Sequence, residues 1–112
     1  MKKQDRRLRR KRGIRKKITG TTVKPRVSVY RSNRHIYVQA IDDELGKTLC
    51  SMSDREAGVK RTREGALAVG EKLGEKLKKA KIKEAVFDRN GYIYHGVVQG
   101  IADGIRKAGI QV

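Results

Sequence analysis

The sequence lacks several features that define whole classes of protein. Its 112 residues include one cysteine and no tryptophan. A single thiol excludes a disulfide within the chain and argues against a Cys-rich zinc site, so Cys50 is expected to be a small buried thiol. No apolar run approaches the roughly 18 residues that a membrane span needs. No apolar segment follows the basic N-terminal residues as it would in a secretory signal. We therefore expect a cytoplasmic protein.

Positive charge is what the sequence has in excess. The formal net charge is +17. A surplus of this size repels itself and usually persists because a polyanion neutralises it. Residues 1–24 hold twelve basic residues and one acidic residue, which gives +11 and leaves +6 for the rest of the chain. The sequence predicts two parts, a basic arm over residues 1–24 and a globular domain over residues 25–112.

The basic arm is predicted to contact nucleic acid. It is too poor in apolar residues to fold alone, and six of its twelve cations are arginines, whose planar fork matches pairs of phosphate oxygens. The alternatives are a solubilising charge run and a membrane-surface helix. The second needs a bulky apolar face, which Leu8, Ile14 and Ile18 are too sparse to form. The predicted contacts are Lys2, Lys3, Arg6, Arg7, Arg9, Arg10, Lys11, Arg12, Arg15, Lys16 and Lys17.

The remaining sequence has the patterns of a folded domain. Alternating apolar and polar residues predict strands, and a 3.6-residue apolar period predicts helices. Residues 31–34 read as a hairpin turn, and Ser53 with Glu56 matches a helix capping pair. Gly109 is placed to end the last helix. The expected strands are residues 26–31, 35–42, 47–51 and 85–87, and the expected helices are residues 63–79 and 94 or 95 to 108.

The element order β-β-β-α-β-α sets the expected fold class. A strand–helix–strand crossover after an antiparallel meander implies one parallel pairing. We therefore expect an α/β domain with a mixed, mainly antiparallel sheet packed by two helices, preceded by a basic unstructured N-terminal arm. In the last helix Gly96, Gly100 and Gly104 recur opposite the apolar stripe. We expect these glycines on an outer face; the alternative is a smooth face approached by a partner's backbone.

No group of residues predicts catalysis. His35 and His95 lack a second metal-ligating residue at helical spacing. Asp42, Asp43 and Asp88 are more simply turn residues, because a two-metal nuclease would need a carboxylate inside the first strand, which has none. The glycine-rich stretch that opens the last helix lacks the Lys-Ser/Thr pair of a P-loop. The sequence predicts no enzyme, no cofactor and no metal site.

Four segments of the chain together resemble one protein family. They are RLRRKRGIRKKITGT (residues 7–21), KPRVSVYRSNRHIYVQAIDD (24–43), VFDRNGYIYHG (86–96) and ADGIRKAGI (102–110). Over nearly its whole length the chain resembles the bacterial form of the large-subunit ribosomal protein that binds 5S ribosomal RNA (rRNA), the eighteenth in the large-subunit numbering. It departs from the family at Val97, where an arginine is usual.

The resemblance implies a function and a set of contacts. The expected protein binds 5S rRNA and helps to attach it to 23S rRNA, beside neighbouring large-subunit ribosomal proteins, with no membrane and no small-molecule substrate. A DNA-compacting architectural protein is the alternative; such a protein usually needs a wedge residue for kinking, and we expect no exposed one in this chain. The implied contacts in the domain are Arg26, Arg31, Ser32, Asn33, Arg34, His35, Tyr37, Arg89, Asn90, Tyr92, Tyr94, His95 and Gly96.

The chemistry of these side chains indicates which contacts supply affinity and which supply selectivity. Structured RNA is recognised by its shape, phosphates and 2′-OH groups, and aromatic side chains stack on exposed bases. The four tyrosines are candidates for stacking, with packing across strands as the alternative. Arg31, Arg34 and Arg89 lie at predicted turns, where side chains reach outward. We expect the arm to supply affinity and the segments 31–37 and 88–96 to select the RNA.

Overall fold

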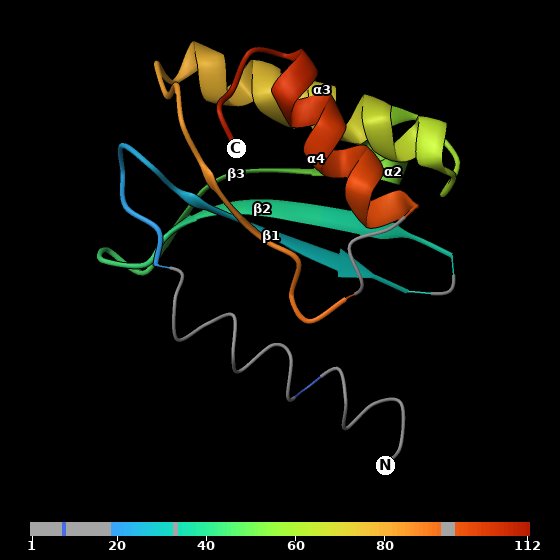
Figure 1. Ribbon diagram of the computed structural model, residues 1–112, viewed down its shortest axis with the longest axis horizontal. Helices are drawn as coiled ribbons and strands as arrows, with labels where there is room; N and C mark the ends of the chain where they lie inside the picture. Colours follow the sequence, from blue (N-terminus) through green and yellow to red (C-terminus); the bar gives the residue numbers. More distant parts are fainter. Residues whose placement is uncertain (1–7, 9–18, 33, 93–95) are drawn as a thin grey trace.

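Four strands form one mixed sheet in the computed structural model, which describes residues 8, 19–32, 34–92 and 96–112 (Figure 1). In the sheet β1 lies between β2 and β4, and β3 is at the far edge. β1 is antiparallel to β2 and parallel to β4. The predicted α/β class with a mixed, mainly antiparallel sheet is confirmed. The strands are β1 (Arg26–Arg31), β2 (Ile36–Asp42), β3 (Lys47–Ser53) and β4 (Val86–Asp88).

The described helices are α2 (Asp54–Ala57), α3 (Arg63–Lys79) and α4 (Val97–Lys107). The short α2 adds one helix to the two that were predicted. Its N-cap is the expected one, since the Ser53 hydroxyl accepts from the backbone N–H of Glu56. α4 ends before Gly109, as predicted, and this glycine has a φ of 99°. Residues 94 and 95, the predicted start of that helix, lie outside the described residues.

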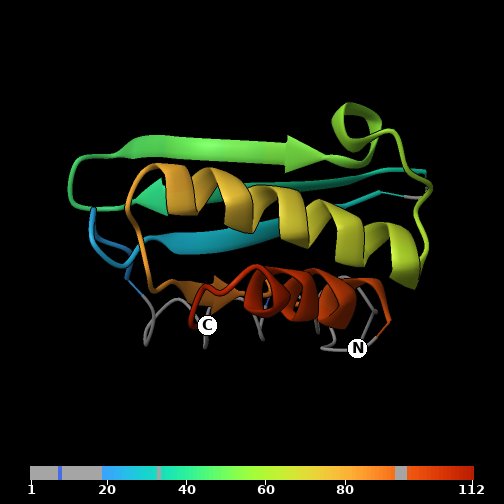
Figure 2. The same ribbon diagram turned by 90° about the horizontal axis from the view of Figure 1, so that it is seen from above.

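The hydrophobic core lies between one face of the sheet and the helices α3 and α4. Figures 1 and 2 show both helices on the same side of the sheet. Period-two alternation accounts for the buried strand positions, because every second side chain points to this face. The opposite face, which we call the open face, carries Tyr30, Tyr37 and Gln39. The core includes Val27, Val29, Ile36, Val38, Ala40, Val69, Leu73, Leu77, Val98, Ile101 and Ile105, all fully buried.

The glycines within α4 pack against α3, so the prediction of an outer glycine face is wrong. A Cβ atom on Gly104 would lie 2.1 Å from the carbonyl oxygen of Leu67. On α3, a Cβ atom on Gly70 would lie 2.2 Å from the carbonyl oxygen of Ile101, and Gly100 is buried in the same contact. The backbones do approach closely, as the alternative proposed, but the second backbone is α3 of the same chain.

Replacing Gly104 with alanine should destabilise the domain by about 2 kcal/mol. The added methyl group would press on backbone atoms that cannot move unless the helices separate, which costs about 1–3 kcal/mol and outweighs the higher helix propensity of alanine. Urea unfolding followed by circular dichroism measures the change. Gln99→Ala, in the same helix, is the control and should stay within about 0.5 kcal/mol of the parent. A Gly104→Ala protein as stable as the control would contradict this account of the contact.

Candidate nucleic-acid interface

The structure describes only part of the predicted RNA-contacting set. The eleven arm residues from Lys2 to Lys17 lie outside the described residues, as do Asn33, Tyr94 and His95. Their roles stay predictions. The described members are Arg26, Arg31, Ser32, Arg34, His35, Tyr37, Arg89, Asn90, Tyr92 and Gly96.

The turn between β1 and β2 is held by Ser32. Its backbone N–H donates to the carbonyl oxygen of His35 at 2.9 Å. Its hydroxyl oxygen accepts from the backbone N–H groups of His35 at 3.1 Å and Arg34 at 3.4 Å. A serine that bonds to nearby backbone is typical of such turns. Ser32 therefore fixes the loop from which the exposed side chains of Arg31 and Arg34 project.

Tyr92 joins the turn after β4 to the end of β1. Its hydroxyl donates to the carbonyl oxygen of Arg31 at 3.1 Å and accepts from the backbone N–H of Arg31 at 3.4 Å. The Arg31 guanidinium carbon lies 5.8 Å from the centre of the Tyr92 ring, within the range of a cation–π contact. Two segments predicted separately to meet RNA are thus brought together, and Tyr92 orients Arg31.

His35 links the same turn to α2. Its Nδ1 lies 3.2 Å from Oδ2 of Asp54, and its Nε2 lies 2.9 Å from Nη2 of Arg55. Because a guanidinium can only donate, Nε2 must be the acceptor and Nδ1–H must donate to the carboxylate. Asp54 is only 3% exposed, whereas Arg55 is exposed. A buried carboxylate thus orients a surface arginine through a neutral histidine.

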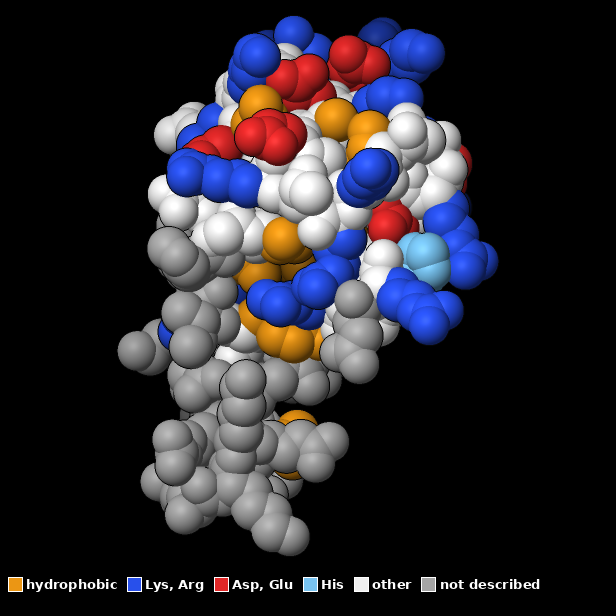
Figure 3. All heavy atoms as spheres, turned by 90° about the vertical axis from the view of Figure 1, so that its right-hand side faces the viewer, with side chains coloured by type: hydrophobic (Ala, Val, Ile, Leu, Met, Phe, Trp, Pro, Cys, Tyr) orange, Lys and Arg blue, Asp and Glu red, His pale blue; other side chains and the backbone are white. Residues whose placement is uncertain are grey.

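Sequence reasoning missed Arg55. The one local signal was the Ser53–Glu56 capping pair, which places Arg55 in the first turn of a short helix. The contact with His35 spans 20 residues and depends on how β3 returns to β2. We call Arg31, Arg34 and Arg55 the cationic end of the domain. Figure 3 looks at this end of the molecule and shows Lys and Arg side chains gathered there around a His side chain.

The turn after β4 is ordered by Asp88, as predicted. Its Oδ1 accepts from the backbone N–H of Asn90 at 2.8 Å. Asn90 has a φ of 53°, in the left-handed region that asparagine tolerates better than most residues, and it is only 2% exposed. Gly96, with a φ of 58° and a ψ of −116°, adopts a conformation that glycine alone reaches readily, just before α4. Asn90 thus shapes the backbone beside Arg89, and Gly96 shapes the backbone that enters α4.

Arg26 lies inside an aspartate cluster. Its Nε and Nη2 donate to the two carboxylate oxygens of Asp43, each at 3.0 Å, and its Nη1 donates to Asp88 at 2.7 Å. Its side chain is 11% exposed, and that of Asp88 is fully buried. Burial alone would lower the pKa of Arg26, but the hydrogen bonds to Asp43 and Asp88 raise it overall. Arg26 therefore stays charged and pairs with carboxylates inside the domain.

The segment leading into β1 is tied to the turn between β2 and β3. The backbone N–H of Gly20 donates to Asp43 Oδ2 at 2.6 Å, and its carbonyl accepts from the Asp43 N–H at 3.0 Å. The Thr22 hydroxyl donates to Asp42, which is the first cause of a lowered pKa at this carboxyl group. Asp42 also accepts from two backbone N–H groups of its own turn. Residues 19–24, which we call the root of the arm, are thus fixed to the domain.

The described residues contain no constellation typical of catalysis. Among them, no group of three or more His, Cys, Asp or Glu residues could hold a metal ion. Cys50 is half-buried on β3. Burial raises the pKa of its thiol despite the nearby Lys76, so the nucleophilic thiolate is disfavoured. No helix in the described part of the chain is long and apolar enough to cross a membrane.

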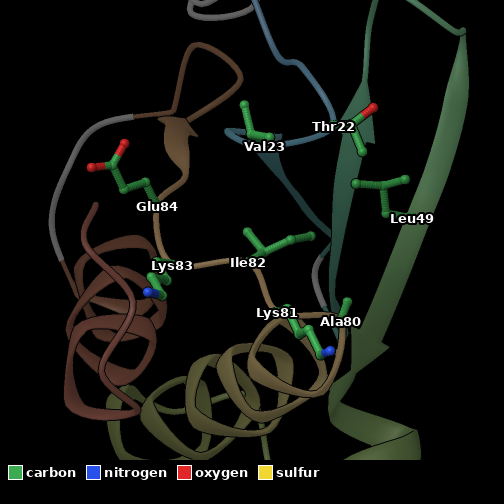
Figure 4. Close-up of a pocket in the computed structure, with 8 residues that line it drawn as sticks. All are labelled: Thr22, Val23, Leu49, Ala80, Lys81, Ile82, Lys83 and Glu84. Atoms are coloured by element: carbon green, nitrogen blue, oxygen red, sulfur yellow. The ribbon is translucent and has the colours of Figure 1, made fainter.

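An open hollow of about 530 Å³ lies between the root of the arm, β3 and the segment after α3 (Figure 4). Half of its lining residues are aliphatic, and its charged side chains are two lysines and one glutamate. This lining lacks a nucleophile paired with a base. The hollow is lined by Thr22, Val23, Leu49, Ala80, Lys81, Ile82, Lys83 and Glu84.

The stability of the domain should fall in acid partly because of Asp54. Burial alone would raise the pKa of Asp54, but hydrogen bonds from His35 and from backbone N–H groups lower it overall. As the pH falls, Asp54 is therefore protonated at a higher pH in the unfolded state than in the folded state. The stabilisation that the Asp54 carboxylate contributes is complete above the ordinary carboxyl pKa of about 3.9. It is lost as the pH falls through the lower pKa of the folded state. Urea unfolding at pH 7, 5 and 3 should show a smaller acid loss for Asp54→Asn. Glu75→Gln is the exposed control, and an unchanged acid loss in Asp54→Asn would disprove the role of Asp54.

Comparison with known proteins identifies the family. The whole chain, residues 1–112, matches the family described as ribosomal L18 of archaea, bacteria, mitochondria and chloroplast. Large ribosomal subunit protein uL18 of Campylobacter hominis is 53% identical over 95% of this chain and 90% of its own length. The uL18 proteins of Nitratiruptor sp. and Campylobacter lari are 51% and 48% identical, over 94% and 95% of this chain and 89% and 90% of their own lengths. The resemblance seen in the sequence is confirmed, and the chain belongs to the ribosomal L18 family.

Proposed function

We propose that this chain is a structural constituent of the large ribosomal subunit in the cytoplasm, where it binds 5S rRNA and helps to attach it to 23S rRNA beside neighbouring ribosomal proteins. Family membership and relatives named large ribosomal subunit protein uL18 support the ribosomal role. The choice of 5S rRNA rests on the sequence segments that resemble its binding protein. The observation that carries the RNA-binding role is the cationic end, where uncharged partners orient Arg31 and Arg55.

The cationic end keeps its charge available for phosphates. Among the described residues, no carboxylate forms an ion pair with Arg31, Arg34 or Arg55. Arg31 is oriented by Tyr92 and Arg55 by His35, so each guanidinium is ordered without being neutralised. Arginine forks bind phosphate oxygens in pairs. The proposal is that these three groups follow the backbone of a folded RNA, whose shape sets the register.

Other members of the predicted set act indirectly in this proposal. Arg26 pairs with Asp43 and Asp88, so its role is to fix β4 and the root of the arm relative to β1. Asn90 is buried and shapes the turn that carries Arg89, and Gly96 supplies the backbone conformation that precedes α4. Replacing Arg26, Asn90 or Gly96 would weaken RNA binding because it would disturb the fold of the domain.

The arm should account for most of the salt dependence of RNA binding. If about eight arm cations contact phosphates, log K should fall against log salt with a slope of about −6 to −7. Deleting residues 1–18 should reduce this slope sharply and leave the domain folded, because Gly20 and Thr22 keep their bonds to the turn. Filter binding across a salt series measures the slope, and circular dichroism checks the fold. An unchanged slope would refute the arm's role.

Arg31 and Arg34 should determine the preference for 5S rRNA. Labelled 5S rRNA competes with generic folded RNA and with duplex DNA at one fixed salt concentration. Arg31→Gln with Arg34→Gln should weaken 5S binding by about tenfold or more, since each loses a charge-assisted hydrogen bond, with a smaller loss on generic RNA. Lys79→Gln, on α3 and away from the turn, is the matched control. Equal losses of affinity for both RNAs would mean that the turn contributes only non-specific electrostatic attraction. Equal binding of 5S rRNA and duplex DNA by the parent would favour the DNA-compacting alternative.

A further inference from the structure

Two tyrosines form an exposed aromatic pair on the open face of the sheet. Tyr30 of β1 and Tyr37 of β2 lie directly opposite each other in the antiparallel register. Their ring centres are 6.3 Å apart, and the ring planes are inclined by 44°. Each residue is 39% exposed, although helices bury the opposite face of the same strands. Packing across the strands explains why the rings touch, but it leaves their outer faces in contact with water.

The surroundings of this pair are polar. Gln39 Nε2 donates to the Tyr37 hydroxyl oxygen at 3.2 Å, which restrains the Tyr37 ring. The residues that follow the pair along the same face of β1 and β2 are Ser28, which is buried, and Gln39, which is half-buried. The buried centre of a protein–protein interface is a larger apolar patch, and two rings beside the Gln39 amide do not form one. A small exposed pair of flat rings instead suits a planar nucleobase.

We propose that Tyr30 and Tyr37 form a stacking platform for one unpaired base of the bound RNA. This proposal rests on the proposed function and adds a contact with a base to the contacts with phosphates. Because the two ring planes are inclined, a single base lies flat on one ring and meets the other at an angle. All four tyrosines were candidates for stacking from the sequence, but the contacts implied by the resemblance contained Tyr37 and not Tyr30.

The platform contributes affinity that does not depend on salt. Stacking displaces no counterions, whereas each phosphate contact does. Removing a ring should therefore lower the binding constant by the same factor at every salt concentration. Removing an arginine should in contrast also change the slope of log K against log salt, by about one for each phosphate contact. The salt series separates the two kinds of contact in one experiment.

The experiment uses the full chain with Tyr30→Leu or Tyr37→Leu, which keeps an apolar side chain at the strand position. The RNAs are a 5S rRNA transcript, a fully paired RNA duplex of the same length and a single-stranded oligoadenylate. Each leucine variant should bind the 5S transcript and the oligoadenylate about 5- to 100-fold more weakly, with an unchanged salt slope. Duplex binding should not change. Tyr30→Phe and Tyr37→Phe should retain the parent affinity.

Leu45→Ala is the matched control, because Leu45 is a 70% exposed apolar residue in the turn between β2 and β3. It should bind all three RNAs like the parent. A second measurement does not depend on how the variants fold. In the parent chain, tetranitromethane should nitrate Tyr30 and Tyr37, and the 5S transcript should protect both while the duplex protects neither, as read by mass spectrometry.

Several results would overturn the platform. They are unchanged affinity of the leucine variants for 5S rRNA, an equal loss on the duplex, or nitration of both tyrosines in the 5S complex. The oligoadenylate distinguishes this failure from failure of the proposed function. A parent chain with no preference for 5S rRNA would refute the proposed function. Even then, the stacking platform would predict that the leucine variants bind oligoadenylate more weakly than the parent.

Discussion

Much of this structure depends on one guanidinium group held between aspartates. Arg26 binds Asp43 through two parallel hydrogen bonds and Asp88 through a third. Asp43 also holds the backbone of Gly20, and the second oxygen of Asp88 orders the turn at Asn90. Loss of one partner of a buried pair leaves the other charge unpaired and costs about 3–5 kcal/mol. One ion-pair cluster therefore joins the root of the arm, the antiparallel meander and the parallel strand β4.

The domain treats its charges in two ways. Where charge holds elements together it is paired with charge, as in the Arg26 cluster and in the ion pair of Lys76 with Glu56. At the cationic end an aromatic ring orients Arg31 and a neutral imidazole orients Arg55. Carboxylate partners at these positions would compete with phosphates for the same donors. Orientation by uncharged groups gives ordered side chains that can still bind a polyanion.

The fold was largely predictable from sequence because its signals are local. Alternation marked β1 and β2, and the 3.6-residue period marked α3. The errors concern contacts between distant residues. A helical wheel places the glycines of α4 on one side, but it cannot predict that α3 packs against Gly104. The resemblance implied that Arg26 contacts RNA, and its pairing with aspartates could not be predicted because those partners lie 17 and 62 residues away. Arg55 was missed because its orientation depends on His35, 20 residues earlier.

The position of β4 has a consequence for the order of assembly. β1, β2 and β3 follow one another in the chain and pair through short turns, whereas β4 pairs with β1 only after α3, with Arg26 opposite Val86. Closing a long loop costs more entropy than closing a hairpin, so the meander can form early in synthesis and β4 late. Tyr92 arrives with β4. During translation Arg31 is therefore synthesised and exposed before Tyr92, whose ring orients it. The ordered cationic end is complete only when nearly all of the chain has been made.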